Sequence, residues 1–429
     1  MGSVRRPILR PIKRGHGREQ VRILSFGTYP IRRPIHGGQR RVSNIAAYYK
    51  TAGHEFRYAS VYMPNAYGAD TVTEDDLPYG SPGGMFSEIP FIDDLGSGVF
   101  ASQNVEPLEH FRAIAGDFKP DVVHLEQPFM WPLVEKMKAL GDLDGVAIVY
   151  SSHNHEAPLK RAILEGAGVS REKTDRAVSA IETVERNLVQ AADLIVAVSA
   201  IEADYYRDLK PRAPVLTIRN GTDRPGRLKK PDGGGELPQG EYLVFVGSAY
   251  PPNISGFTKF VLGDSLYGLP PRKLISVCGG AADGIFASID YLPHASSYGD
   301  RVHFFARPSD EELHWIQNGA KGSLLPIASG GGSNLKTAEA LCSGKWLIAT
   351  PTALRSFEDF EHEKGVIVAS TPKQFRDAML DVIYAPPLSL TKTELAKRHG
   401  LYWDNLLKCS DLIAEVDKAV KRANAGLKS

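Results

Sequence analysis

Short, mainly apolar segments alternate with amphipathic stretches along most of this chain of 429 residues. Residues 21–26, 121–125, 146–150 and 193–198 are such apolar runs, and residues 174–192 carry apolar side chains at helical spacing. Strands this short and this apolar are typical of a parallel sheet that is covered by helices on both faces. The alternation therefore predicts an α/β fold of doubly wound type.

The alternation is interrupted once and then starts again. Residues 229–240 are rich in Pro and Gly, which is the composition of a linker. Beyond them, further strands are predicted at 242–246, 274–277, 302–305, 322–325 and 345–349. We therefore expect an N-terminal domain at 21–232, a second domain at 238–402, and a C-terminal helix within 403–429 that packs back on the first domain. Ligands bind beyond the strand carboxyl ends in such sheets, which predicts a site in an inter-domain cleft.

Positive charge is concentrated at the start of the chain. The first 50 residues contain twelve Lys or Arg and a single acid, whereas the remaining 379 contain 39 basic and 49 acidic residues. Two interpretations stay open for residues 1–20: a disordered, solvated tail, or a contact with an anionic partner such as lipid phosphate. No aromatic residue interleaves the first charges, so we expect no nucleic-acid partner.

Composition favours a protein of the cytoplasm. The chain is 42% hydrophobic and has no apolar run long enough to span a bilayer. No apolar stretch follows the first positive charges, so no secretory signal is expected. The three cysteines, Cys278, Cys342 and Cys409, are far apart and predict neither a disulfide framework nor a zinc site. Peripheral contact with the inner face of the membrane through the basic N-terminus is an additional expectation.

A glycine-rich segment is the most informative motif. Gly330, Gly331 and Gly332 follow a predicted strand and precede a predicted helix that opens at about residue 333 or 334. Glycine permits close backbone approach, and the amides at a helix start bind anions, so a diphosphate is the natural ligand. Lys336 and Glu339 share one face of that helix and offer a cation for phosphate and a carboxylate for sugar hydroxyls. The alternative is a tight turn, capped by the adjacent serine, with a surface ion pair.

Polar side chains also follow strands of the first domain. His153 and Glu156 come after a strand, where an imidazole can hold or move a proton near neutral pH and the carboxylate can orient it or cap the next helix. A purely structural histidine is the alternative. A metal is a further alternative, but the spacing of His153, His155 and Glu156 is poor for a closed zinc site. His124 and Glu126 follow the preceding strand and are similar candidates.

Several ordered segments of the chain resemble those of retaining glycosyltransferase family 4. They span roughly residues 21–370 and comprise residues 37–42, 152–156, 185–199, 219–223, 245–256, 309–313 and 330–344. The resemblance implies the GT-B fold, in which two Rossmann-like domains face each other across a cleft. It also implies transfer of a sugar, with retention of configuration, from a nucleotide-sugar donor to a glycan, lipid-linked or other small acceptor.

The resemblance implies roles for individual residues. His153 and Glu156 are the expected catalytic pair. The expected donor-binding residues are Gly331, Gly332, Ser333, Asn334, Leu335, Lys336, Glu339, Ser248, Arg307, Asn220 and Arg219. The expected acceptor-binding residues are Gly37, Gly38, Arg40, Arg41, His124 and Glu126.

The same resemblance implies a hexosyltransferase of class EC 2.4 in polysaccharide biosynthesis. The donor would be a UDP- or GDP-sugar, the acceptor anionic or lipid-linked, and no metal or other cofactor would be needed.

The chain departs from the family pattern at two places. Gly331 stands where the family has the first of two glutamates eight residues apart, and residues 247–253 lack the usual Arg and Lys. Two rivals therefore stay open: a nucleotide-binding but inactive GT-B relative, and a GT-B epimerase. A dehydrogenase would need a strand followed by Gly-x-Gly-x-x-Gly and an acid about 20 residues on, which the chain does not contain.

Overall fold

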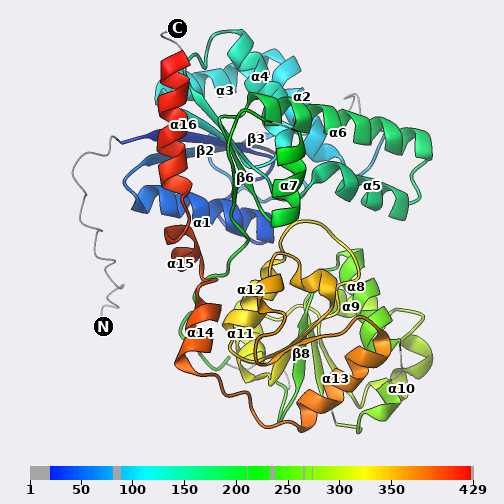
Figure 1. Ribbon diagram of the computed structural model, residues 1–429. Coiled ribbons are helices and arrows are strands. Elements are labelled where there is room, and N and C mark those ends of the chain that lie inside the picture. Colours follow the sequence, from blue (N-terminus) through cyan, green and yellow to red (C-terminus); the bar gives the residue numbers. More distant parts are fainter. Residues whose placement is uncertain are drawn as a thin grey trace, which may run out of the picture. The chain divides into compact units, whose positions relative to one another are not determined.

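The computed structural model describes residues 20–80, 88–209, 211–231, 237–263, 266–272 and 274–426. It divides into two compact units, residues 1–218 with 407–429 and residues 219–406 (Figure 1). The division after Ile218 lies ahead of the linker composition at 229–240. The basic segment 1–20 lies outside the described residues except for Gln20.

The first unit contains a sheet of seven strands in the order β3-β2-β1-β4-β5-β6-β7. All of its pairings are parallel, and in the register of the two central strands Ile23 lies opposite Val122. The strands are β1 (Arg22–Gly27), β2 (Glu55–Tyr62), β3 (Leu77–Pro78), β4 (Val122–Leu125), β5 (Ala147–Ser151), β6 (Leu194–Ala197) and β7 (Val215–Thr217).

The second unit contains a sheet of six parallel strands in the order β10-β9-β8-β11-β12-β13. The strands are β8 (Leu243–Val246), β9 (Ile275–Cys278), β10 (Val302–Phe305), β11 (Gly322–Leu325), β12 (Trp346–Ala349) and β13 (Val366–Val368). The five strands predicted for this half of the chain are confirmed, each within one residue at either end.

Helices connect the parallel strands in both units. In the first unit they are α1 (Gly37–Thr51), α2 (Asp93–Gln103), α3 (Val105–Phe118), η1 (Pro128–Met130), α4 (Trp131–Ala139), α5 (Glu156–Gly166), α6 (Arg171–Ala191), α7 (Ala200–Asp208) and α16 (Leu412–Gly426). In the second unit they are α8 (Pro251–Phe257), η2 (Thr258–Leu262), η3 (Leu266–Gly268), α9 (Ala281–Phe286), η4 (Leu292–His294), α10 (Ala295–Tyr298), α11 (Asp310–Gly319), α12 (Leu335–Cys342), η5 (Pro351–Leu354), η6 (Glu358–Phe360), α13 (Pro372–Tyr384) and α14 (Lys392–His399). Helix α15 (Trp403–Lys408) spans the division between the units. Among the described residues, no helix is both long enough and apolar enough to cross a membrane.

The prediction of one C-terminal helix needs correction. The helix expected within 403–429 is interrupted, because α15 ends at Lys408 and α16 begins at Leu412.

Helix α1 begins at Gly37, so both glycines expected to bind the acceptor lie in its first turn. His36 and Gln39 form a capping box there, which satisfies the amides at the helix start and makes two successive glycines tolerable inside it.

Each unit has its own apolar core. In the first, Phe26 of β1, Phe111 of α3 and Leu133 of α4 are fully buried in one cluster. Helix α16 also packs on this sheet against β5 and β6 (Figure 1), and its Arg422 donates to the Asp193 carbonyl at 2.7 Å. The last helix therefore belongs to the same unit as the beginning of the chain.

Both sheets show the topology of Rossmann-like domains. Strand order reverses between β1 and β4 in the first sheet and between β8 and β11 in the second. Connections from the two strands at such a switch point leave toward opposite faces, so a crevice forms beyond their carboxyl ends. A binding site is therefore expected among the residues that follow β1, β4, β8 and β11.

Candidate functional site

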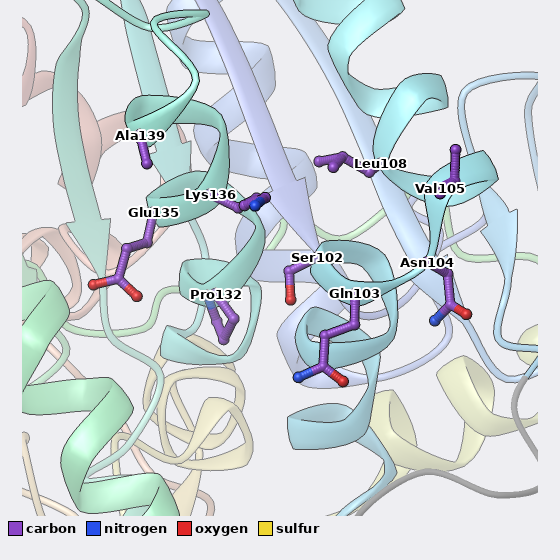
Figure 2. Close-up of a pocket in the computed structure, with 9 residues that line it drawn as sticks. All are labelled: Ser102, Gln103, Asn104, Val105, Leu108, Pro132, Glu135, Lys136 and Ala139. Atoms are coloured by element: carbon purple, nitrogen blue, oxygen red, sulfur yellow. The ribbon is translucent and has the colours of Figure 1, made fainter.

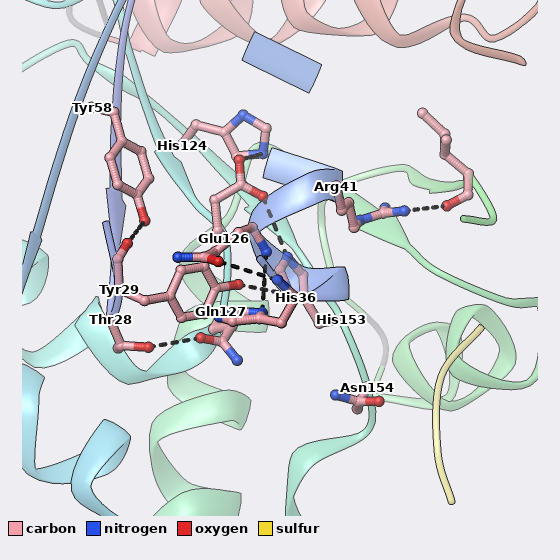
Figure 3. A network of polar contacts seen from close by, with 12 residues as sticks. Thr28, Tyr29, His36, Arg41, Tyr58, His124, Glu126, Gln127, His153 and Asn154 are labelled. Atoms are coloured by element: carbon pink, nitrogen blue, oxygen red, sulfur yellow. Dashed lines mark hydrogen bonds and ion pairs between the residues drawn. The ribbon is translucent and has the colours of Figure 1, made fainter. Parts of the chain in front are cut away.

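A polar cluster lies where β1 and β4 end (Figure 3). Glu126 directly follows β4 and is fully buried, with Oε1 3.8 Å from His124 Nε2 and Oε2 3.6 Å from His153 Nε2. The other ring nitrogens face tyrosines: His124 Nδ1 is 3.3 Å from the Tyr49 hydroxyl, and His153 Nδ1 is 3.2 Å from the Tyr29 hydroxyl. One carboxylate thus lies within ion-pair distance of two histidines to which the sequence assigned different roles.

The centre of this cluster has unused hydrogen-bonding capacity. Within the described part of the chain, neither Glu126 oxygen makes a hydrogen bond, and Nε2 of His124 and of His153 makes none either, although all four atoms are buried. Buried polar groups nearly always have a partner in a folded protein. These four atoms are therefore available to hydrogen-bond a small polar group, such as water or a ligand hydroxyl.

The charge state of the cluster follows from burial and its neighbours. Burial disfavours the charged form of Glu126, but His124, His153 and Arg41 outweigh it and leave the pKa of this carboxyl below its usual range. Burial lowers the pKa of both His124 and His153, against the opposing effect of Glu126. The cluster therefore holds a buried carboxylate, with the buried Arg41 as the charged group of opposite sign that acts on it.

Helix α1 contributes a close backbone approach and a buried cation. A Cβ at Gly38 would lie 2.5 Å from the Tyr29 hydroxyl and 3.4 Å from His153 Nδ1, so a larger residue there would displace the Tyr29 side chain. Arg41 is 1% exposed, and its Nη1 donates to a backbone carbonyl at 3.0 Å. Arg40 is only partly buried. Of the two arginines expected to meet an acceptor, Arg41 is thus an internal charge of the cluster.

Glu156 belongs to a second buried group. It begins α5, is 2% exposed and accepts a hydrogen bond from Asn154 Nδ2 at 3.3 Å. Burial raises the pKa of Glu156 to about 8. Burial also raises the pKa of Glu185 to about 7, against the effect of the Tyr150 and Tyr206 hydroxyls that donate to it at 2.8 and 2.9 Å.

The sequence paired His153 with Glu156, whereas the carboxylate within ion-pair distance of His153 Nε2 is a different one. The carboxylate beside His153 is that of Glu126, whereas Glu156 lies with Glu185. His155, the third residue of the considered metal set, stacks on Tyr205 with ring centroids 3.6 Å apart. In the described parts of the chain, no group of three or more His, Cys, Asp or Glu side chains is arranged to hold a metal ion.

In the second unit, the glycine-rich loop lies between β11 and α12, at the switch point of the sheet. The helix is capped by Asn334, whose side chain accepts from the Lys336 amide at 3.1 Å, rather than by Ser333. Asn220 holds Ser333 from the other side: its amide donates to Ser333 Oγ at 3.1 Å and its Nδ2 to the Ser333 carbonyl at 2.6 Å. Gly332 has a φ of +65°, which favours glycine.

Lys336 connects this loop to the end of β8. Its Nζ donates to Asn253 Oδ1 at 3.1 Å, and Asn253 Nδ2 donates to the Ser248 carbonyl and hydroxyl at 3.0 and 3.1 Å. Burial lowers the pKa of Lys336 to about 8, although Glu339 acts in the opposite direction. The structure thus brings Ser248, Lys336 and Glu339 together beside the loop, with a lysine whose charge is poorly solvated.

The two arginines predicted for donor binding are placed differently. Arg219 forms an ion pair with Asp359 at 2.6 Å and lies 5.6 Å from the centroid of the Phe357 ring. Arg307 is exposed beyond β10 and makes no hydrogen bond or ion pair with any residue in the described ranges. Lys336, in the helix that begins directly after the loop, therefore remains the leading cation among the residues predicted from sequence.

A cavity of about 660 Å³ opens elsewhere in the first unit, between α2, α3 and α4 (Figure 2). It is lined by Ser102, Gln103, Asn104, Val105, Leu108, Pro132, Glu135, Lys136 and Ala139. None of these is a residue that the sequence predicts for the site, and no fully buried polar side chain faces it.

Four residues at these sites were missed at the level of sequence. Tyr29 lies in the loop after β1 and Asn253 in the first turn of α8, which follows β8, so their short distance in sequence from a strand end was a usable signal. Tyr49 lies within α1 and gave no signal beyond the apolar face of that helix. Arg355 contacts backbone 23–25 residues earlier in the chain, and no local pattern marks such a contact.

Comparisons with known proteins agree with this architecture. Residues 35–224 match the family model described as Glycosyltransferase Family 4, and this region lies almost wholly in the first unit. The comparison with curated protein sequences gave no match. The whole chain resembles solved structures of the GT-B type, at identities that establish the fold alone.

One similar structure is the sucrose-phosphate synthase (tll1590) from Thermosynechococcus elongatus, with a TM-score of 0.65, 16% identity, and coverage of 93% of this chain and 100% of that one. Another is Anabaena Alr3699/HepE in complex with UDP and glucose, with a TM-score of 0.60, 12% identity and coverage of 92% and 99%. A third is the catalytic domain of starch synthase IV from Arabidopsis thaliana bound to ADP and acarbose, with a TM-score of 0.56, 11% identity and coverage of 95% and 100%. The predicted α/β fold with two Rossmann-like domains of GT-B type is confirmed.

Proposed function

We propose that this chain is a glycosyltransferase of family 4 that transfers a sugar from a nucleotide-sugar donor to a hydroxyl of an acceptor. The family match over residues 35–224 and the GT-B fold support this proposal. The observation that carries it is the loop Gly330–Gly332 at the switch point of the second sheet, with Lys336 and Glu339 beside it. Small residues, a helix start and a poorly solvated cation together suit a diphosphate.

The second unit is the proposed donor-binding unit. Burial lowers the pKa of Lys336, so a bound diphosphate would stabilise its charged form. Glu339 lies one helical turn further on, where its carboxylate is proposed to accept hydrogen bonds from ribose. Similar structures were recorded with UDP, UDP-glucose and ADP. We propose a UDP- or GDP-sugar as donor, with no metal or other cofactor.

The proposed reaction breaks the bond between the anomeric carbon and the diphosphate and forms a bond from that carbon to the acceptor oxygen. Negative charge develops on the leaving diphosphate, where Lys336 and the amides of the loop would stabilise it. The acceptor hydroxyl loses a proton in the same process, and the released diphosphate or water takes this proton up. Retention of configuration, hexosyl transfer and a role in polysaccharide biosynthesis are part of the proposal.

The first unit is the proposed acceptor-binding unit. The unused polar atoms of Glu126, His124 and His153 suit a sugar or acceptor hydroxyl, and His153 remains the proposed contact with the reacting groups. A glycan, a lipid-linked acceptor or another small anionic acceptor fits the positive charge of the first 50 residues. We also propose that the protein is cytoplasmic and contacts the inner face of the membrane peripherally through its basic N-terminal segment.

The direct test is binding and turnover with the full-length chain. Thermal melting is measured with UDP, GDP, ADP and dTDP and with their sugar conjugates, with Mg²⁺ and with EDTA. We expect one nucleotide to raise the melting temperature in both conditions, and Lys336→Ala or Glu339→Ala to abolish the shift. Lys392→Ala, an exposed lysine at the start of α14, is the matched control.

The rival functions differ in the chemistry that comes after nucleotide binding. Gly331 stands in place of a glutamate, which keeps open an inactive relative that binds nucleotide and an epimerase that acts on the donor alone. Release of nucleotide that depends on an added acceptor supports the transferase. Binding with no turnover favours the inactive relative, and a changed sugar on an intact nucleotide favours the epimerase. Absence of any binding contradicts the proposal.

A further inference from the structure

One arginine holds all three glycines of the loop. Arg355 follows η5, and its guanidinium donates to three consecutive carbonyls: Nε to Gly332 at 2.7 Å, Nη2 to Gly331 at 2.6 Å, and Nη1 to Gly330. A guanidinium presents its donors in a rigid planar fork, so a single side chain can bind several acceptors in a fixed geometry. The conformation of the loop is therefore tied to Arg355.

The backbone that carries Arg355 is itself firmly placed. Leu354 on one side and Phe357 on the other are buried at 2% and 0% exposure. Between them, Ser356 has a φ of +73°, a region that costs a non-glycine residue free energy, and its amide donates to Glu358 Oε1 at 3.0 Å. The surrounding core thus maintains an unfavourable backbone conformation directly beside the arginine.

Holding the carbonyls also orients the amides. In a trans peptide the C=O and the N–H of the next residue point in opposite directions. Because Arg355 binds the carbonyls of residues 330–332, the amides of residues 331–333 are turned away from it. Asn220 binds the Ser333 carbonyl and so turns the amide of Asn334, the N-cap residue of α12, away from Asn220.

The charge of the arginine adds to this orientation. Gly331 brings no carboxylate to the loop, in contrast to the family pattern, and the nearest predicted cation, Lys336, has a pKa lowered to about 8 by burial. A guanidinium stays charged at any physiological pH. Arg355 therefore makes the loop permanently electropositive as well as ordered.

We infer that Arg355 is a positioning residue for donor binding: it holds Gly330–Gly332 in the conformation in which the amides of residues 331–333 receive the diphosphate of the nucleotide-sugar. The inference rests on the proposed function. If the inference is right, removing the three hydrogen bonds lowers the affinity for nucleotide. The second unit should still fold, because its own apolar core is unchanged.

The test uses the full chain and the nucleoside diphosphate that the wild type binds in a panel of UDP, GDP and ADP. Arg355→Ala is expected to weaken binding by roughly 10- to 100-fold, since a hydrogen bond from a charged group is typically worth 1.5–3 kcal/mol. Arg355→Lys keeps a charge but not the fork, so we expect only partial affinity. Arg272→Ala, an exposed arginine of the same unit, should bind as the wild type does.

Chemical rescue separates positioning from a general structural role. Low-millimolar guanidinium chloride is expected to restore nucleotide affinity and KM for the donor in Arg355→Ala, whereas ammonium chloride at equal concentration is not. If Arg355→Ala fails to fold, the partial loss of nucleotide affinity expected for Arg355→Lys, measured against Arg272→Ala, is the test. Nucleotide affinity unchanged in either folded variant overturns the inference and leaves the proposed function standing. A wild type that binds none of the nucleotides overturns both.

Discussion

At the scale of single residues, the buried carboxyl of Glu156 makes a prediction about pH. Burial raises its pKa from 4.5 to about 8, so between these values the folded protein retains a proton that the unfolded chain has lost. Stability therefore falls as pH rises through this window, and the full stabilising contribution exists only below pH 4.5. We expect Glu156→Gln, which cannot ionise, to gain roughly 1–3 kcal/mol at pH 8 relative to the wild type, a gain that vanishes toward pH 4.5.

Urea denaturation of both proteins at several pH values measures this difference. Glu165→Gln, an exposed position on the same helix, is the matched control and should show no such trend. A Glu156→Gln difference that is constant with pH would mean that the carboxyl is ionised in the folded protein. Glu156 would then be a charged group held by its neighbours.

At the scale of elements, two helices of the first unit respond oppositely to the same substitution. Gly98 lies in α2, where an added Cβ would be only 1.7 Å from the Phe129 carbonyl oxygen of η1. Gly116 lies in α3, where an added Cβ meets nothing within 4 Å. We expect Gly98→Ala to destabilise by about 3 kcal/mol, because α2 must move away from η1, and Gly116→Ala to stabilise by about 1 kcal/mol through helix propensity.

Thermal and urea unfolding of the two variants provide the comparison. Each serves as the control for the other, since the covalent change is identical and both positions are helical. Equal effects of the two substitutions would contradict the close packing of α2 on η1. This packing positions the chain that leads from β4 into α4, and so the segment that carries Glu126.

At the scale of the whole molecule, the first unit is built from both ends of the chain. Val416 of α16 is fully buried, and this helix packs on β5 and β6. Val416→Asp is expected to destabilise the first unit by about 3 kcal/mol or more, since a charge would be buried without a partner. Because the second unit has a separate core, its stability should change little.

Hydrogen exchange measured by mass spectrometry resolves the two units. We expect faster exchange in β5 and β6 of Val416→Asp and unchanged exchange in β9 and β11. Lys421→Asp, at an exposed position of the same helix, is the control. Faster exchange in all four strands would show that the two units unfold together.

Much of the architecture was readable from sequence, because local physics decides it. Short apolar runs such as 242–246, each followed by a helical pattern, favour buried strands of a parallel sheet, so fold class and strand positions were predictable. The glycines 330–332 before a helix marked the proposed diphosphate loop for a similar reason. Strand β2, over Glu55–Tyr62, carries charged residues at one end and was not predicted.

Only the tertiary structure decided which residues that are distant in the chain come into contact. Glu126, Tyr29 and His153 meet because β1 and β4 are neighbours at the switch point and the end of β5 lies beside them, an order that strand composition does not encode. Arg355 reaches Gly330–Gly332 because β11 and β12 pair in parallel, which places the ends of both strands at one edge of the sheet. Sequence thus determined which local elements form and which residue types end them. Sheet order, set by packing of the whole unit, determined which of those residues come into contact.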